Sequence, residues 1–329
     1  MLTNSYHASS DRQVDTRARL KLMTLLKTYR KLIAVIAAAF VLFAFGALVS
    51  HALVDQYPEG QGGPRIVTGN EQVVATSRSI VEIMDRMDAN LIGVPQSELE
   101  NSTRFVGAAN VGASMSPDME IIRAINPDWT FAPRTLETGL RPAFEAARID
   151  VAFLNLRSIN GMYAAIAELG PLLAREDQAS ALVAEFENFK TQLEEATTFS
   201  DNPPRVLILM GLPGSYLVAT EHSYIGSLVA MTGAINVYDD KAGEFISINT
   251  EDMLTREPDI ILRAAHALPD EVLEMFDEEF RENNIWRHFE AVEQGRVYDL
   301  PHAQFGMSAN FEYTQALETL SQIFTQAGF

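Results

Sequence analysis

A histidine at the end of a buried apolar run is the first residue of this sequence that could do chemistry. His266 follows the turn residues Pro258 and Asp259 and an apolar run over residues 260–265. A short apolar run bounded by turn residues is typical of a strand buried on both faces, as in a parallel sheet covered by helices. We therefore expect His266 at the carboxyl edge of a strand, either as a metal ligand or as a hydrogen-bonded structural histidine.

A methionine in a small and polar segment is the second candidate. Met115 lies between the tripeptide Gly112-Ala-Ser114 and the dipeptide Ser116-Pro117, which are not the flanks of a methionine in a core helix. Methionine usually fills gaps in an apolar core, but its thioether is also a soft metal ligand. Taken alone, these residues leave both interpretations of Met115 open.

Two glutamates occupy equivalent positions in two similar segments. Residues 119–132 align without a gap with residues 250–263, so that Glu120 and Glu251 precede their Pro-Asp dipeptides by the same interval. Each segment has the pattern of a helix, a turn and a buried strand. The repetition predicts two lobes of related architecture.

Length and composition restrict the class of protein. The chain has 329 residues and 47% hydrophobic content, which suffices for two domains with their own cores. The absence of cysteine excludes disulfides, thiolate metal sites, cysteine nucleophiles and a lipid anchor on cysteine. The net charge of −19 divides into +5 on residues 1–31 and −24 on the rest. Such an acidic body disfavours nucleic acid as a partner.

An apolar segment follows the basic tail formed by residues 1–31. Residues 32–54 are about as long as a membrane-spanning helix requires. The basic residues before this segment predict a cytoplasmic N-terminus and an extracytoplasmic body. A signal peptide cleaved near Ser50-His51-Ala52 is the alternative, and either interpretation exports the body. Residues 55–64 read as a flexible linker.

The remainder alternates strands with helices, which is typical of α/β lobes with parallel sheets. We expect a first lobe at 65–170 and a second at 200–329, separated by a long interlobe helix at 171–199. Gly170-Pro171 should divide that helix from the one before it. Thr76-Ser77 should provide the N-cap of a helix ending at Met87. The expected strands are 65–68, 72–75, 91–94, 105–107, 129–132, 151–155, 205–210, 216–219, 260–264 and 297–300.

Longer runs point to a family. They include Val-Leu-Ile-Leu-Met-Gly-Leu-Pro-Gly-Ser-Tyr-Leu-Val-Ala-Thr-Glu at 206–221 and Pro-Asp-Ile-Ile-Leu-Arg-Ala-Ala-His at 258–266, together with 76–87, 92–95, 223–226, 249–251, 285–286, 296–300 and 305–307. Over residues 65–328 the chain resembles the class III (cluster A-II) substrate-binding proteins of ABC importers for iron chelates, haem and cobalamin, and among them the haem-binding subfamily. The resemblance implies two Rossmann-like lobes joined by one long helix, with the ligand held between them.

The resemblance also implies a ligand and the residues that bind it. In the haem-binding members, the iron of haem b (iron protoporphyrin IX) is held by a methionine of the first lobe and a histidine of the second. Met115 and His266 match these positions, and a thioether with an imidazole is a known axial pair for haem iron. His222 and His302 are rival histidines in predicted loops, at positions where the family pattern requires none.

Two further groups of residues follow from this reading. The helix start formed by Thr76, Ser77, Arg78 and Ser79 could bind the haem propionates, with Gln96 and Ser97 adding hydrogen bonds. Plain N-cap chemistry with a solvated arginine is the alternative. Glu120 and Glu251 match the glutamates with which the family docks onto arginines of two permease subunits, although a solvated helix start would also explain them.

These inferences predict a function and its alternatives. We expect a monomeric protein at the extracytoplasmic face of the membrane, anchored by residues 32–54 or secreted after cleavage. It would take haem, directly or from a surface donor protein, to an ABC permease and its ATPase. A ferric siderophore or cobalamin is the alternative ligand. An enzyme is disfavoured, because the sequence has no nucleophile elbow, phosphate loop, zinc-helix motif or paired catalytic carboxylates. A sensor or adhesion ectodomain has no dedicated feature.

Overall fold

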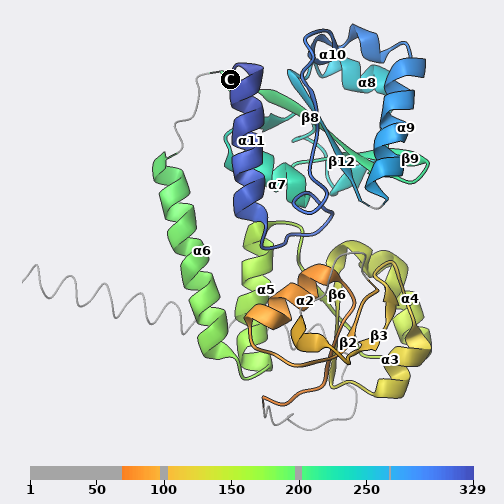
Figure 1. Cartoon of the computed structure of the whole chain (residues 1–329), viewed down its shortest axis with the longest axis vertical. Helices are drawn as coiled ribbons and strands as arrows, with labels where there is room; N and C mark the ends of the chain where they lie inside the picture. The colour runs from red at the N-terminus through yellow and green to blue at the C-terminus, as the bar shows by residue number, and fades with distance from the viewer. Residues whose placement is uncertain (1–68, 97–102, 197–201, 267) are drawn as a thin grey trace, which may run out of the picture. The chain divides into compact units, whose positions relative to one another are not determined.

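The computed structural model describes residues 69–96, 103–196, 202–266 and 268–329 (Figure 1). They all belong to one compact unit, Ile66–Phe329. The predicted basic tail, membrane segment and linker, the strand at 65–68 and Ser97 lie outside these ranges. Within the ranges, no helix is both long enough and apolar enough to cross a membrane.

The first sheet has five parallel strands in the order β3-β2-β1-β6-β7. They are β1 (Val73–Ala75), β2 (Leu91–Val94), β3 (Ala109–Asn110), β6 (Trp129–Pro133) and β7 (Ala152–Leu154). The helices of this part are α2 (Arg78–Arg86), α3 (Met119–Ile125), η2 (Arg134–Leu136) and α4 (Glu137–Ala147). All three residues of the central strand β1 are buried, as expected for a parallel sheet covered on both faces.

The strand predicted at residues 105–107 is wrong. Thr103–Phe105 instead forms the short helix η1, and β3 begins only at Ala109. Gly107 has φ of +100°, and the amide of Ala108 donates to the carbonyl of Phe105. A positive φ turns the chain out of the extended conformation, and glycine tolerates it readily. The buried Phe105 side chain therefore packs into the core from the end of η1 rather than from a strand.

The second sheet follows the order β11-β9-β8-β12-β13, with β10 also paired to β8. Its strands are β8 (Arg205–Leu212), β9 (Ser215–Ala219), β10 (Ile235–Asn236), β11 (Phe245–Ile246), β12 (Ile260–Ala265) and β13 (Val297–Asp299). The helices of this part are α7 (Tyr224–Met231), α8 (Thr250–Thr255), α9 (Pro269–Glu282), η3 (Trp286–His288), α10 (Glu290–Glu293) and α11 (Tyr313–Ala327). Strands β8, β12 and β13 are parallel, whereas β9 and β11 add an antiparallel edge.

An arginine lies inside the buried strand β12. Arg263 is 8% exposed, and two of its nitrogens donate to the two carboxylate oxygens of Asp299 at 2.6 and 2.7 Å. A third nitrogen donates to Asp277 at 2.9 Å. Because the buried charge is paired and hydrogen-bonded in this way, the strand can carry an arginine without an uncompensated desolvation cost.

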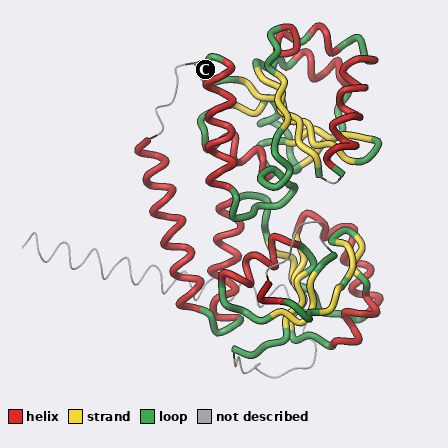
Figure 2. Tube along the Cα trace, in the orientation of Figure 1, coloured by secondary structure: helices red, strands yellow, loops and turns green. Residues whose placement is uncertain are grey.

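Two long helices connect the parts that contain the two sheets (Figure 2). They are α5 (Ile159–Leu172) and α6 (Glu176–Ala196). The predicted division at Gly170-Pro171 is three residues early, since both residues belong to α5 and the break is at Ala174, whose φ is +50°. A Cβ on Gly170 would lie 2.9 Å from the Cβ of Ala179. Glycine at this position therefore allows α5 and α6 to pack closely rather than ending the helix.

One apolar cluster includes side chains from both sheets and from α5. Val73 of β1, Ile166 of α5 and Ile208 of β8 are buried members of this cluster. On α5, Tyr163 stacks on Phe186 of α6 with ring centroids 4.3 Å apart. Its hydroxyl lies 3.2 Å from that of Tyr313. The core is therefore continuous across α5.

The two aligned segments adopt the same local structure. Helix α3 leads to β6, and α8 leads to β12. The Oδ2 of Asp128 accepts a hydrogen bond from the amide of Gln72 at 2.8 Å, and the Oδ2 of Asp259 accepts one from Arg205 at 2.8 Å. Each aspartate also donates its amide to the carbonyl of that same residue. Each Pro-Asp turn thus fixes its strand to the start of the first strand of its sheet.

Candidate ligand-binding site

Three neighbouring strands of the first sheet deliver predicted site residues at one edge. Thr76 follows β1, Gln96 lies just beyond β2, and the Met115 loop follows β3. Because these strands are parallel neighbours, their carboxyl ends lie at the same edge of the sheet. Ligands of open α/β sheets bind at that edge.

Met115 lies at the tip of a small hairpin. Strands β4 (Gly112–Ala113) and β5 (Ser116–Pro117) pair antiparallel, with Met115 in the turn between them. The carbonyl of Gly112 accepts from the amide of Gln96 at 2.7 Å, which ties the hairpin to β2. Met115 is 60% exposed, whereas Met210, on β8, is fully buried. Met115 therefore does not fill the core.

The start of α2 differs from the N-cap that the sequence predicts. Ser77 has the backbone conformation of an N-cap, but neither it nor Thr76 caps the helix with its side chain. The hydroxyls of Thr76 and Ser77 and the Nη1 of Arg78 are buried and form no hydrogen bond within the described part of the chain. By contrast, the side chain of Ser158 caps α5 at 3.1 Å. The predicted position of the N-cap is therefore confirmed at Ser77, but its hydroxyl does not cap the helix, and these donors are left for another acceptor.

The other described residues of the predicted propionate-binding set are less buried than Thr76 and Ser77. Arg78 is not fully solvated, because its Nε donates to the Oε1 of Glu82 at 2.7 Å. Ser79 is half-buried, and the side chain of Gln96 is exposed. Buried donors at this edge are thus concentrated at residues 76–78.

His266 directly follows β12, at the carboxyl edge of the second sheet, as predicted. Its amide donates to the carbonyl of Gly211 at 3.0 Å, while its ring forms no hydrogen bond within the described ranges. Burial, and to a lesser degree the neighbouring His302, lowers the pKa of His266 below its ordinary 6.5. The imidazole is therefore neutral at neutral pH, which is the form that binds a metal.

The two rival histidines differ in their surroundings. His222 is exposed at the start of α7, where its amide donates to the hydroxyl of Thr220 at 3.2 Å. His302 is half-buried, and its Nδ1 lies 2.7 Å from the carbonyl oxygen of Ala265. Of the two, only His302 is placed beside His266.

The repeated glutamates are both exposed at helix starts. Glu120 is the second residue of α3, behind the N-cap Asp118. Glu251 is the second residue of α8, behind the N-cap Asn249. Negative charge is favourable at these positions because of the helix dipole, and the exposed carboxylates are accessible to a partner.

An ion pair that the sequence analysis missed joins the two parts of the chain. The Nε of Arg157, after β7, lies 2.7 Å from the Oε1 of Glu244, before β11. Neither residue belongs to a motif, and the sequence alone predicts each to be an ordinary solvent-exposed charged residue. No local pattern in the sequence could therefore have paired them.

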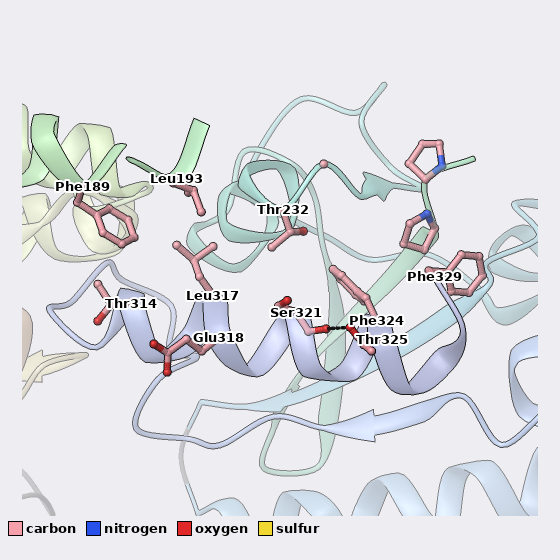
Figure 3. A pocket seen from close by; sticks show the side chains of 13 residues that line it. Phe189, Leu193, Thr232, Thr314, Leu317, Glu318, Ser321, Phe324, Thr325 and Phe329 are labelled. Atoms are coloured by element: carbon pink, nitrogen blue, oxygen red, sulfur yellow. Dashed lines mark hydrogen bonds between the residues drawn. The ribbon is translucent and has the colours of Figure 1, made fainter. Parts of the chain in front are cut away.

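The pocket in Figure 3 is separate from the predicted site residues at the two sheet edges. It has a volume of about 480 Å³ and is formed by α6, α11 and the segment around Pro203 and Pro204. Apolar side chains such as Leu193, Leu317 and Phe324 line it. None of the predicted site residues belongs to its lining.

The fold and these edge loops agree with a known family. A family model described as periplasmic binding protein matches residues 73–303. The chain belongs to the periplasmic binding protein family. Members of this family bind solutes for transport, in agreement with the prediction that the chain is not an enzyme.

Individual relatives place the chain more narrowly within the periplasmic binding protein family. It is 36% identical over 257 residues to the high-affinity heme uptake system protein IsdE of Staphylococcus aureus, covering 78% of this chain and 88% of that protein. The solved structure of S. aureus IsdE complexed with heme matches with a TM-score of 0.74 at 36% identity, over 77% of this chain and 98% of that one.

A second structural relative supports the importer class. An ABC transporter substrate-binding protein from Listeria monocytogenes EGD-e matches with a TM-score of 0.72 at 42% identity, over 77% of this chain and 98% of that one. The resemblance predicted from the sequence, to the class III substrate-binding proteins of ABC importers, is therefore confirmed.

Proposed function

We propose that this protein captures haem b outside the cytoplasm and delivers it to an ABC importer. The observation that carries the proposal is the pairing of two features: homology to IsdE, which was solved with heme, and a thioether and an imidazole at the carboxyl edges of the two sheets. The identity to IsdE favours haem over a ferric siderophore or cobalamin.

The side chains present suit haem iron. Met115 offers a neutral, accessible sulfur, and His266 offers a half-buried imidazole that is neutral at physiological pH. When bound, haem would supply an iron with two axial positions, for which a thioether and an imidazole are suitable ligands. Since the two donors belong to different sheets, both parts of the chain contribute to binding.

The start of α2 suits the haem propionates. The hydroxyls of Thr76 and Ser77 and the Nη1 of Arg78 are buried donors without an acceptor in the described part of the chain. A carboxylate would satisfy them and would also be stabilised by the free amides at the helix N-terminus. Ser79 and Gln96 are placed nearby at the same sheet edge, and Ser97 completes the proposed set.

The proposal also includes the transport partners of the protein and its location. Exposed Glu120 and Glu251 would meet cationic side chains of two permease subunits, which are coupled to an ATPase. Residues 32–54 would anchor the protein at the extracytoplasmic face, or would be removed as a signal peptide. The acidic body, which carries −24, suits recognition by a basic partner surface.

Haem titration tests the proposal. The full-length protein should develop a Soret band with haem, and Met115→Ala should lose the near-infrared charge-transfer band of the ferric iron–thioether bond. His266→Ala should weaken haem binding roughly tenfold, the equivalent of losing about 1.4 kcal/mol. Val106→Ala, at an apolar side chain that is 87% exposed, and His222→Ala serve as controls. Met115→Ala and His266→Ala variants with unchanged spectra and affinity would exclude the assigned ligands, and saturable binding of a siderophore or cobalamin instead would overturn the haem proposal.

A further inference from the structure

A second histidine lies beside His266 at the edge of the second sheet. Strands β12 and β13 are parallel neighbours, with Arg263 in register with Asp299. His266 is the first residue after β12, and His302 lies shortly after β13. Both imidazoles are half-buried. The sheet therefore presents two imidazoles at its carboxyl edge.

A hydrogen bond determines the state of the His302 ring. Its Nδ1 lies 2.7 Å from the carbonyl oxygen of Ala265, the residue before His266. A carbonyl oxygen can only accept a hydrogen bond, so the Nδ1 of His302 must carry the hydrogen. In the neutral ring, Nε2 is then unprotonated and has a free lone pair.

The surrounding backbone holds His302 in place. The amides of Gln304 and Phe305 both donate to the carbonyl of Pro301 and close a turn around the histidine. Phe305 is fully buried in the apolar cluster, which fixes this turn to the core. His302 is therefore presented on an anchored turn.

This arrangement is the one that metal-binding histidines usually have. Such a histidine donates its other ring N–H to a carboxylate, a backbone carbonyl or a water, which fixes the tautomer and the orientation of the ring. His302 meets this condition within the protein, whereas the ring of His266 forms no hydrogen bond in the described ranges. The influence of His302 on the pKa of His266 agrees with their proximity.

We propose that His302 is a second imidazole donor to the iron of the bound haem, able to take the position of His266. The inference rests on the proposed function. It adds a second iron ligand from the second sheet, whereas Met115 comes from the first. Replacement of one imidazole by another would keep the iron coordinated while one histidine is released.

The decisive test uses ferric haem and the full-length protein. His266→Ala should remain low-spin with a histidine ligand by electron paramagnetic resonance, although haem dissociates about tenfold faster. His266→Ala combined with His302→Gln should be high-spin, and free imidazole should restore the low-spin signal. Glutamine can still donate to the carbonyl of Ala265, so this pair separates loss of the ligand from loss of the hydrogen bond. His266→Ala with His222→Ala is the matched control and should resemble His266→Ala.

Two results would overturn the inference. One is a high-spin His266→Ala variant that free imidazole rescues as well as it rescues the double variant. The other comes from haem-free protein: ¹⁵N spectra of labelled histidine should show His302 with a protonated Nδ1 and a bare Nε2, and the opposite tautomer would exclude Nε2 as a donor. This second readout does not depend on haem, so the two failures can be told apart: absence of haem binding refutes the proposed function, whereas the opposite tautomer refutes the role of His302 alone.

Discussion

The Nε of Arg157 lies 2.7 Å from the Oε1 of Glu244, and this ion pair joins the loop after β7 to the segment before β11. The side chain of Glu244 is 9% exposed, whereas that of Arg157 is 47% exposed. The second oxygen of Glu244, Oε2, is buried and has no hydrogen bond in the described part of the chain. Burial raises the pKa of Glu244 above its ordinary 4.5, and Arg157 opposes this rise. The negative charge of Glu244 is therefore compensated mainly by Arg157.

Arg157→Ala should destabilise the protein by about 2 kcal/mol at pH 7, because it leaves a buried carboxylate unpaired. The folded state already binds the Glu244 proton more tightly than the unfolded state, so this group favours folding less as pH rises above 4.5. Removing Arg157 raises the folded-state pKa further, and the destabilisation should grow between pH 5 and pH 7.5. Urea unfolding at both pH values measures it.

A second substitution provides the control for this pair. Arg157→Ala combined with Glu244→Gln should recover much of the lost stability at pH 7.5, because no buried charge remains. Arg141→Ala, which removes an exposed pair with Glu137 on α4, should cost less than about 1 kcal/mol at either pH. A loss in Arg157→Ala that is independent of pH would contradict the assigned role of Glu244.

Gly226→Ala should destabilise the protein by about 3 kcal/mol. A Cβ at Gly226, in α7, would lie 2.0 Å from the carbonyl oxygen of Thr220. Backbone cannot move aside as a flexible side chain does. Gly139→Ala is the matched control, because Gly139 also lies in a helix, α4, and a Cβ there meets nothing within 4 Å. It should be neutral or stabilise by up to about 1 kcal/mol, and thermal unfolding of both variants compares them.

Thr76→Val and Ser77→Ala should each weaken haem binding about tenfold without loss of stability. Their hydroxyls form no hydrogen bond in the described part of the protein, so removing them costs the fold little. The same variants should bind the dimethyl ester of haem as tightly as the unmodified protein does, because the ester lacks the carboxylates. Isothermal titration with both haems measures this difference.

Ser158→Ala is the complementary control, since the hydroxyl of Ser158 caps α5. It should lose about 1 kcal/mol of stability and keep its haem affinity. If the α2 variants instead lose stability and bind both haems equally, the propionate assignment fails.

Glu120→Gln with Glu251→Gln should slow haem delivery three- to tenfold and leave haem binding unchanged. Exposed charges at an interface act mainly on the association rate and on orientation. The effect should shrink at high salt, where the attraction is screened. Stimulation of the transporter ATPase in proteoliposomes measures delivery, and Glu145→Gln, at an exposed glutamate of α4, should have no effect.

Local patterns predicted most of the fold because each depends on neighbouring residues. The apolar run before His266 is β12, and the repeated Pro-Asp segments are the turns before β6 and β12. Short aromatic or glycine-containing segments were less reliable. Phe105 packs from the short helix η1, and Gly170 allows close packing of α5 on α6 rather than ending a helix.

The candidate site was only partly predictable. The sequence places Met115 and His266 in loops, and the structure shows how the hairpin and β12 present them. Which hydrogen bonds and ion pairs a side chain forms depends on tertiary packing. For this reason the uncapped hydroxyl of Ser77, the bond from His302 to Ala265 and the pairing of Arg157 with Glu244 had no signature in the sequence.

The apolar cluster that runs from β1 through α5 to β8 has a consequence for the lifetime of the protein in the cell. A core that is continuous across the connecting helix couples the two sheets, because loss of either half would expose apolar surface of the other to water. A protease that degrades unfolded chains would therefore find few molecules in which one half is unfolded and the other intact. If Met115 and His266 both bind the ligand as proposed, turnover of the carrier and loss of its cargo become a single event.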